Sequence, residues 1–207
     1  QGGGRVRSRR GAWPRKVGTG FRIKASRNQG QAVALSFSVD DKGILPDTMI
    51  AALAKVGGIL PARDFAPDQI QPASLDLRLG DVAYRVRASF LPGPHGTVGR
   101  RIADLKLHEV SLTNGAVLET GCVYIVPLME SLRLPDDTVP PANPKSSTGR
   151  LDVFTRVIAD ETRGFDRISP GYHGPLSGLM KNALDTLELT RTDPQAYLTH
   201  KAVGIIV

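Results

Sequence analysis

The stretch Ser74-Leu75-Asp76-Leu77-Arg78-Leu79 decides the fold class, because leucine alternates with a charged residue along it. A period of two is typical of a β-strand that turns one face toward a core. Further strand candidates, separated by Gly, Pro and Asn, cover residues 82–87, 116–118, 122–126 and 151–158. Short strands with frequent turn signals predict a mainly β fold, a distorted β-barrel or jelly-roll-like structure.

One short helix is expected before these strands, at residues 47–56. Asp47 is a plausible N-cap, and Gly57-Gly58 would end the helix. The apolar residues with helical spacing are Met49, Ile50, Leu53 and Val56. A second, weaker helix is expected at residues 178–189, where the strand pattern stops.

The charge of the chain is concentrated in its first 39 residues. They hold nine of the 27 basic residues and no acid, whereas all 20 acidic residues follow them. We expect residues 1–39 to be a disordered or non-native tail. Such a tail could also bind nucleic acid, but few aromatic residues are interleaved with the basic ones, so we do not favour nucleic acid as a partner.

Composition also limits the compartment and the metal chemistry. No apolar run is long enough for a transmembrane helix, and no apolar signal-peptide core is present, so we expect no membrane partner. A single cysteine, Cys122, excludes an internal disulfide and a multi-cysteine zinc site. A reducing cytoplasm fits best.

Two segments carry residues suited to binding a nucleotide. Lys145-Ser146-Ser147-Thr148-Gly149-Arg150 places cations and hydroxyls between strand candidates, as phosphate oxygens require. A Ser-rich turn with solvated charges is the alternative, and the order of a Walker A loop is absent. The second segment, residues 165–176, could shape a pocket around a planar base or form an ordinary hairpin turn.

Together these segments resemble the dCTP deaminase/dUTPase superfamily. Lys145-Ser146-Ser147-Thr148-Gly149-Arg150 resembles its triphosphate motif, and Asp166-Arg167-Ile168-Ser169-Pro170-Gly171-Tyr172-His173-Gly174 resembles its later motif. Gln71-Pro72-Ala73-Ser74-Leu75-Asp76-Leu77-Arg78-Leu79-Gly80 is similar to the early signature of the deaminase branch, and Gly43-Ile44-Leu45-Pro46-Asp47 to the start of its long bacterial members. The resemblance covers about residues 43–176 and points to the N-terminal half of such a two-module member, with a dUTPase-type fold.

The resemblance implies a chemistry and a set of residue roles. The family hydrolyses dCTP to dUTP and ammonia without zinc, with Mg²⁺ accompanying the triphosphate, and forms homo-oligomers, usually trimers, whose active sites lie between subunits. By resemblance, the catalytic residues are Ser146, which helps hold the attacking water, and Arg150, which stabilises developing charge. The substrate-binding residues would be Lys145, Ser146, Ser147, Arg150, Arg167, Ile168 and Tyr172. No residue is expected to bind a metal directly.

The sequence departs from the family at one decisive position. The glutamate that shuttles protons in the family is expected three residues after Leu176, and Leu179 stands there. We therefore expect a deaminase-like β domain that is incomplete, an unrecognised segment at 177–207, and a chain that is inactive as written. A frameshift, a chimeric end or a truncated gene would explain the departure. The alternatives are a nucleotide-binding module without catalysis and a dUTP diphosphatase-like enzyme.

Overall fold

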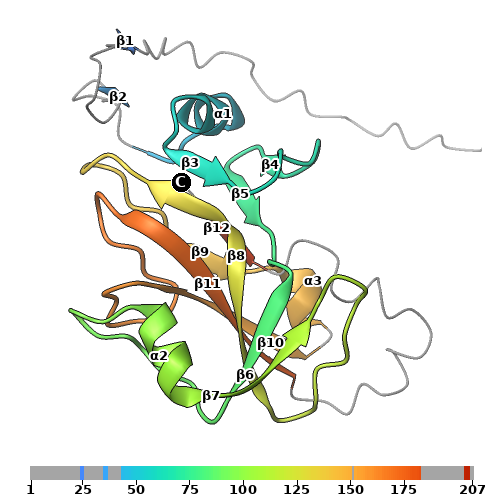
Figure 1. Cartoon of the computed structure of the whole chain (residues 1–207). Coiled ribbons are helices and arrows are strands. Elements are labelled where there is room, and N and C mark those ends of the chain that lie inside the picture. The colour runs from blue at the N-terminus through green and yellow to red at the C-terminus, as the bar shows by residue number, and fades with distance from the viewer. Residues whose placement is uncertain (1–23, 26–34, 37–42, 151, 183–202, 206–207) are drawn as a thin grey trace, which may run out of the picture.

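A computed structural model describes residues 24–25, 35–36, 43–150, 152–182 and 203–205 (Figure 1). Its helices are α1 (Asp47–Lys55), α2 (Val98–Leu105) and α3 (Ser146–Gly149). Its strands are β1 (Lys24–Ala25), β2 (Leu35–Ser36), β3 (Ile59–Pro61), β4 (Ile70–Gln71), β5 (Ser74–Leu77), β6 (Val82–Val86), β7 (Lys106–Ser111), β8 (Val123–Arg133), β9 (Ala142–Pro144), β10 (Val153–Ala159), β11 (His173–Asn182) and β12 (Val203–Ile205). Strands outnumber helices, so the expectation of a mainly β fold is confirmed.

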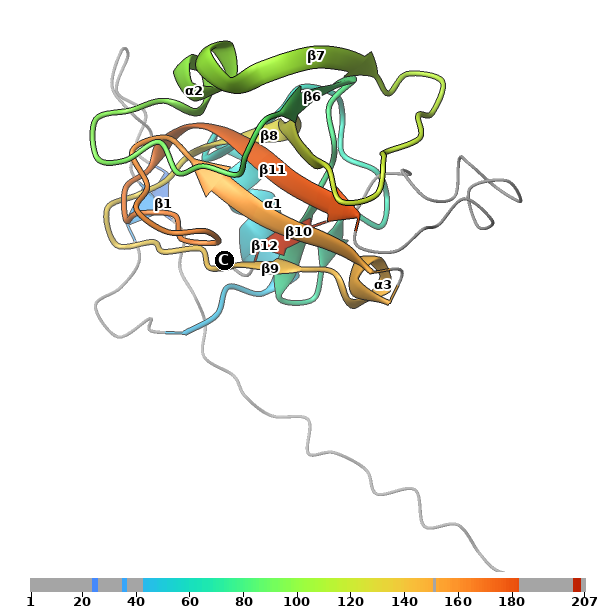
Figure 2. The same ribbon diagram turned by 90° about the horizontal axis from the view of Figure 1, so that it is seen from below.

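The strands form two main antiparallel sheets. The larger has six strands in the order β10-β11-β8-β6-β7, with β3 also paired to β8. The smaller has four strands in the order β4-β5-β12-β9. Figure 2 shows β10 and β11 crossing the middle of the molecule, with β6 and β7 above them and β9 and β12 below. The outer pair β1–β2 is separate from both sheets.

The main core fills the space between the two sheets and α1. From α1 it takes Ile50 and Leu53, which are almost fully buried, as their helical spacing predicts. From β5 it takes Leu75 and Leu77, both fully buried. The larger sheet contributes chiefly Tyr124, Val126, Leu132, Val153, Val157, Leu176 and Met180. Burial of this many apolar side chains is the main stabilisation of the fold.

A second apolar cluster lies on the opposite face of the larger sheet, under α2. The helix contributes Val98 and Ile102, which are one helical turn apart and both buried. The strands contribute Val86, Ile125, Ile158 and Leu179, with Phe90 from the loop before α2. The larger sheet is therefore covered on both faces, which explains why Ile158 and Ala159 are buried next to each other on β10.

Three local expectations are wrong. Asp47 is the first helical residue rather than the N-cap, which is Pro46; the Asp47 carboxylate accepts a hydrogen bond from Thr48 N (2.7 Å). Residues 116–118 belong to no strand. Residues 178–182 are strand rather than helix, because β10 and β8 flank β11 and pair with it on both sides. Tertiary pairing there overrides the local preference.

Other expectations fall on residues that the structure does not describe. Of the basic tail, only β1 and β2 are described, so disorder in the rest of residues 1–39 stays a prediction. The same holds for residues 183–189 of the expected second helix. In the described part of the chain, no helix has both the length and the apolar character needed to cross a membrane.

Candidate functional site

The segment from Lys145 to Arg150, which the sequence predicts to bind phosphate, forms a short connection between the two sheets. It follows β9 and runs through α3 into β10, with Lys145 as the helix N-cap. Ser146, Ser147 and Arg150 are all exposed, and their backbone is held by local bonds such as Arg150 N to Ser146 O (3.0 Å). Two hydroxyls and a guanidinium predicted to bind substrate therefore lie together at the surface of one turn.

Lys145 differs from its neighbours because its ammonium is already paired. Its Nζ lies 2.5 Å from Oδ2 of Asp76 on β5. The Asp76 side chain is 3% exposed and that of Lys145 is 30% exposed. Asp76 also receives structural support from Gln69, whose backbone carbonyl accepts from Asp76 N at 3.0 Å. Lys145, the cation predicted to bind phosphate, is thus paired with a buried carboxylate of the smaller sheet.

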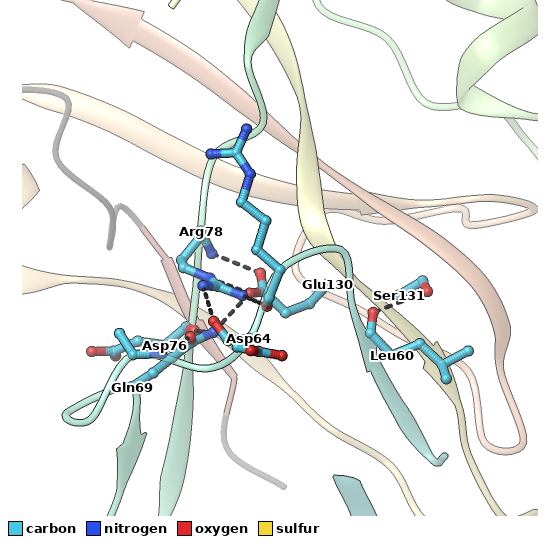
Figure 3. Close-up of polar contacts among 9 residues, drawn as sticks. Leu60, Asp64, Gln69, Asp76, Arg78, Glu130 and Ser131 are labelled. Carbon is cyan, nitrogen blue, oxygen red and sulfur yellow. Dashed lines mark hydrogen bonds and ion pairs between the residues drawn. The ribbon is translucent and has the colours of Figure 1, made fainter. Parts of the chain in front are cut away.

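A buried polar network lies immediately beside this carboxylate (Figure 3). Glu130, with 0% side-chain exposure, accepts at Oε1 from Arg78 Nε (2.8 Å) and from Gln69 Nε2 (2.7 Å). Its Oε2 accepts from Arg78 N (2.8 Å). Gln69 Nε2 is also 2.9 Å from the backbone carbonyl of Asp76. Every one of these buried charges has a partner, as a low-dielectric interior requires.

The same network organises the loop between β3 and β4. The guanidinium of Arg78 donates to the carbonyls of Asp64 (2.8 Å) and Arg63 (2.6 Å). Sequence reasoning missed Asp76, Arg78, Glu130 and Gln69 as a group. The charged residues were visible in the alternation of residues 74–79, but period-two spacing alone does not show that Asp76 and Arg78 are buried.

Arg167 and Ile168 line a separate cavity of about 890 Å³. Ile168 is buried, whereas Arg167 is exposed. The loop is braced from within by Thr162, whose hydroxyl donates to the carbonyl of Gly164 at 2.8 Å and lies 3.2 Å from that of Arg167. The other residues lining the cavity are Val139, Pro140, Pro141, Glu161, Arg163, Asp166 and Ser169.

Two lining residues hold left-handed backbone conformations that non-glycine residues rarely adopt. Glu161 has φ 60° and Asp166 has φ 61°. Asp166 is anchored by its carboxylate, which accepts from Val157 N (2.8 Å) and pairs with Arg156 NH1 (2.6 Å). The loop is held in a defined shape at some conformational cost, as is common in ligand-binding loops.

Tyr172 does not line this cavity. Its hydroxyl donates to the carbonyl of Pro175 (2.7 Å) and accepts from the backbone N–H of Asp160 (3.1 Å). Burial is the main cause that raises the pKa of Tyr172 to about 12, helped by the nearby charges of Asp160 and Glu161. Tyr172 therefore ties the end of β10 to β11 as a neutral group.

Leu179 lies in the middle of β11, opposite Arg156 of β10 and Ile125 of β8. Its side chain is 7% exposed and packs in the apolar cluster under α2. The described members of that cluster are all hydrophobic. Leu179, which stands where the family resemblance led us to expect a glutamate, is thus a buried member of an apolar cluster.

A second cavity, of about 520 Å³, lies between α2 and β11 and includes Ser177, two residues before Leu179. The described acidic residues that line it are Glu109 and Asp160. Glu109 pairs with Lys106 at 2.6 Å, and Oδ1 of Asp160 accepts from Val98 N at 2.7 Å. Both carboxylates are already engaged in local contacts.

The predicted residues therefore divide into three places in one chain. Lys145, Ser146, Ser147 and Arg150 lie at α3, Arg167 and Ile168 line the larger cavity, and Tyr172 bridges the end of β10 to β11. The residues at α3 do not line either of the two cavities described above. Within the described ranges, no group of three or more His, Cys, Asp or Glu residues is placed to hold a metal ion.

Comparison with known proteins identifies a family. Residues 41–182 match the model of the 2'-deoxycytidine 5'-triphosphate deaminase N-terminal domain. The dCTP deaminase of Haemophilus ducreyi is 31% identical over 53% of this chain and 57% of its own length. The "dCTP deaminase, dUMP-forming" of Salinispora arenicola is 33% identical over 67% of this chain and 68% of its own length.

A solved structure supports the same conclusion. The crystal structure of 2'-deoxycytidine 5'-triphosphate deaminase from Agrobacterium tumefaciens is 58% identical, with a TM-score of 0.66, over 68% of this chain and 42% of that chain. The present chain thus spans less than half of that protein and about 57% of the Haemophilus relative. The expected dUTPase-type fold is confirmed by this likeness. The chain belongs to the family of 2'-deoxycytidine 5'-triphosphate deaminase N-terminal domains.

Proposed function

We propose that the segment from Lys145 to Arg150 binds the triphosphate of a deoxycytidine nucleotide. The observation that carries this proposal is the exposure of Ser146, Ser147 and Arg150 on a single turn, beside the Lys145 ammonium, inside the range that matches the family. Charge-assisted bonds from Arg and Lys to phosphate oxygens are roughly twice as strong as neutral ones. Mg²⁺ would arrive with the triphosphate and be held mainly by phosphate oxygens, since Mg²⁺ keeps most of its water ligands.

We propose that the base and sugar of the nucleotide occupy the larger cavity. Arg167 lines it as an exposed cation and Ile168 as a buried apolar wall. A cavity of about 890 Å³ is large enough for a base and sugar. Because these residues and α3 line different regions of one chain, we propose that the complete site forms between subunits of a homo-oligomer, in a trimer-like assembly. The cytoplasm, where dCTP is found, is the proposed compartment.

The deamination implied by the family is hydrolysis at C4 of the cytosine ring. Water must lose a proton as it attacks, and the departing amine must gain one, so a group that both accepts and donates a proton is required. Leu179 can do neither. Losing this function lowers the rate by roughly 10²–10⁴-fold. We therefore propose that this chain binds nucleotide but does not deaminate dCTP at a useful rate.

A second candidate function is the formation of dUMP from dCTP, which the names of two relatives suggest. The Salinispora protein is described as dUMP-forming, which adds hydrolysis of the triphosphate to deamination. Leu179 favours nucleotide binding without catalysis over this second candidate.

The decisive experiment pairs an activity assay with a binding assay. Ammonia release from dCTP with Mg²⁺ is followed by high-sensitivity detection, and dUTP binding is measured by calorimetry. We expect no release above background and measurable dUTP binding that Lys145→Ala and Ser146→Ala weaken about ten-fold each. Lys55→Ala, at the exposed end of α1, is the matched control and should leave binding unchanged. Turnover at enzyme rates would show that another group supplies the proton.

A further inference from the structure

The two side chains of the Lys145–Asp76 ion pair differ in how far they can move. Asp76 lies on β5, its carboxylate is 3% exposed, and its backbone bonds to Gln69 on both the N–H and the carbonyl side. Gly204 of β12 stands opposite Asp76 on one side and opposite Asn143 of β9 on the other. The carboxylate is therefore a fixed part of the sheet, whereas the Lys145 side chain is 30% exposed at the sheet's edge.

From this arrangement we propose that Asp76 is an internal counterion that repels phosphate bound at Lys145 and so limits the anion affinity of the α3 site. The proposal rests on the function proposed for Lys145. An ammonium has three donors, so Lys145 can bind a phosphate without leaving Asp76. The phosphate would then lie near a carboxylate that cannot move away, and the two like charges repel each other.

Asp76 also favours anion binding in one respect, because it orders the Lys145 side chain before the ligand binds. The two effects differ in scale. Ordering concerns the rotamers of one side chain, which is already partly buried. Repulsion acts on every charge of the triphosphate near a carboxylate shielded from water. We therefore expect repulsion to dominate, so that neutralising Asp76 strengthens anion binding.

The test is a double-mutant cycle with Asp76→Asn, Lys145→Ala and the double variant. Affinities for dUTP and for inorganic tripolyphosphate are measured by calorimetry, and thermal unfolding reports whether each variant is folded. Asp76→Asn should tighten both ligands by about three- to ten-fold. In the Lys145→Ala background the same substitution should change affinity less than two-fold, because the phosphate is no longer held close to Asp76. Asp76→Ser is a second neutral variant in case the asparagine is poorly accommodated.

Asp81→Asn is the matched control. It makes the same carboxylate-to-amide change on an exposed ion pair with Arg63 (2.6 Å), and it should leave both affinities within two-fold. Unchanged or weaker binding in folded Asp76→Asn, while Lys145→Ala still weakens binding, would overturn the counterion role and leave Asp76 as a support for Lys145. If Lys145→Ala itself has no effect on either ligand, the proposed phosphate site fails as well, so the two failures are distinguishable.

Discussion

Arg78 and Glu130 form an ion pair inside the protein, with Nε and Oε1 2.8 Å apart and side chains that are 8% and 0% exposed. A charge that loses its partner in such a place is strongly destabilising, whereas replacing both partners is tolerated better. The pair also fixes the carbonyls of Arg63 and Asp64, so it connects β5 and β8 to the loop before β4.

Glu130→Gln should therefore lower the free energy of unfolding by about 3–5 kcal/mol, because Arg78 would remain buried without its counterion. Asp81→Asn removes the exposed pair with Arg63 and should cost less than about 1 kcal/mol. Urea unfolding of both variants measures the difference. Similar losses of unfolding free energy in the two variants would mean that water reaches the Arg78 guanidinium.

Leu179→Glu tests how apolar the surroundings of this position are. Burial beside Ile125 and Ile158 disfavours the ionised form, so the pKa of the new carboxyl should lie above its usual range. The stability of this variant should fall as pH rises above about 4.3, the ordinary glutamate pKa. At pH 7 we expect a free energy of unfolding roughly 2–4 kcal/mol below that of Leu179→Gln. Urea unfolding between pH 4 and pH 8 gives the comparison; parallel curves for the two variants would show a solvated site.

Tyr172 gives a prediction at high pH. Its pKa in the folded chain is raised to about 12, above the ordinary value of about 10. The neutral hydroxyl is the favoured form, so its contribution to stability is complete below pH 10 and is lost as pH rises toward 12. Tyr172→Phe should remove this loss and lower stability near pH 7 by about 1 kcal/mol, because the bond to Pro175 disappears. Chemical unfolding at pH 7 and pH 11 measures both effects, and an unchanged pH dependence in the variant would exclude Tyr172 as its source.

Alanine substitutions at Gly171 and Gly121 distinguish the cost of a steric clash from the cost of backbone strain. Both have positive φ, 62° and 75°, so alanine is strained at either position by about 1–2 kcal/mol. At Gly171 a Cβ would also collide with Asp136, whereas at Gly121 no atom lies within 4 Å. Because the Asp136 carboxylate oxygen belongs to an exposed side chain that can rotate away, Gly171→Ala should destabilise more than Gly121→Ala by less than about 1 kcal/mol. Thermal unfolding of the two variants tests this order, which the reverse ranking would contradict.

The sequence predicts those elements whose burial follows a simple period. Residues 82–87 and 151–158 correspond closely to β6 and β10, and residues 47–56 to α1. By contrast, β7 went unpredicted because all but one of its residues are exposed, so it has no alternating apolar pattern. The helix α2 was also missed. Its signal was the spacing of Val98 and Ile102 after Thr97, whose hydroxyl caps Arg100 N at 3.3 Å.

The candidate site was predictable in its residue types but not in its contacts. The exposure of Ser146 and Arg150 agrees with a ligand-binding turn. The pairing of Lys145 with Asp76 depends on two residues 69 positions apart, which no local pattern connects.

The position of β12 has a consequence for the order in which the chain acquires its structure. β12 pairs Val203 with both Leu77 and Pro144, so the smaller sheet joins segments from distant parts of the chain. Contacts of such long sequence separation form slowly, because a large loop must close first. The hairpin of β10 and β11 closes a much shorter loop, so it can form before β12 joins the smaller sheet. Asp76 and the strand that leads to Lys145 are therefore joined through β12 only at the end of folding, and the anion site should mature later than the larger sheet.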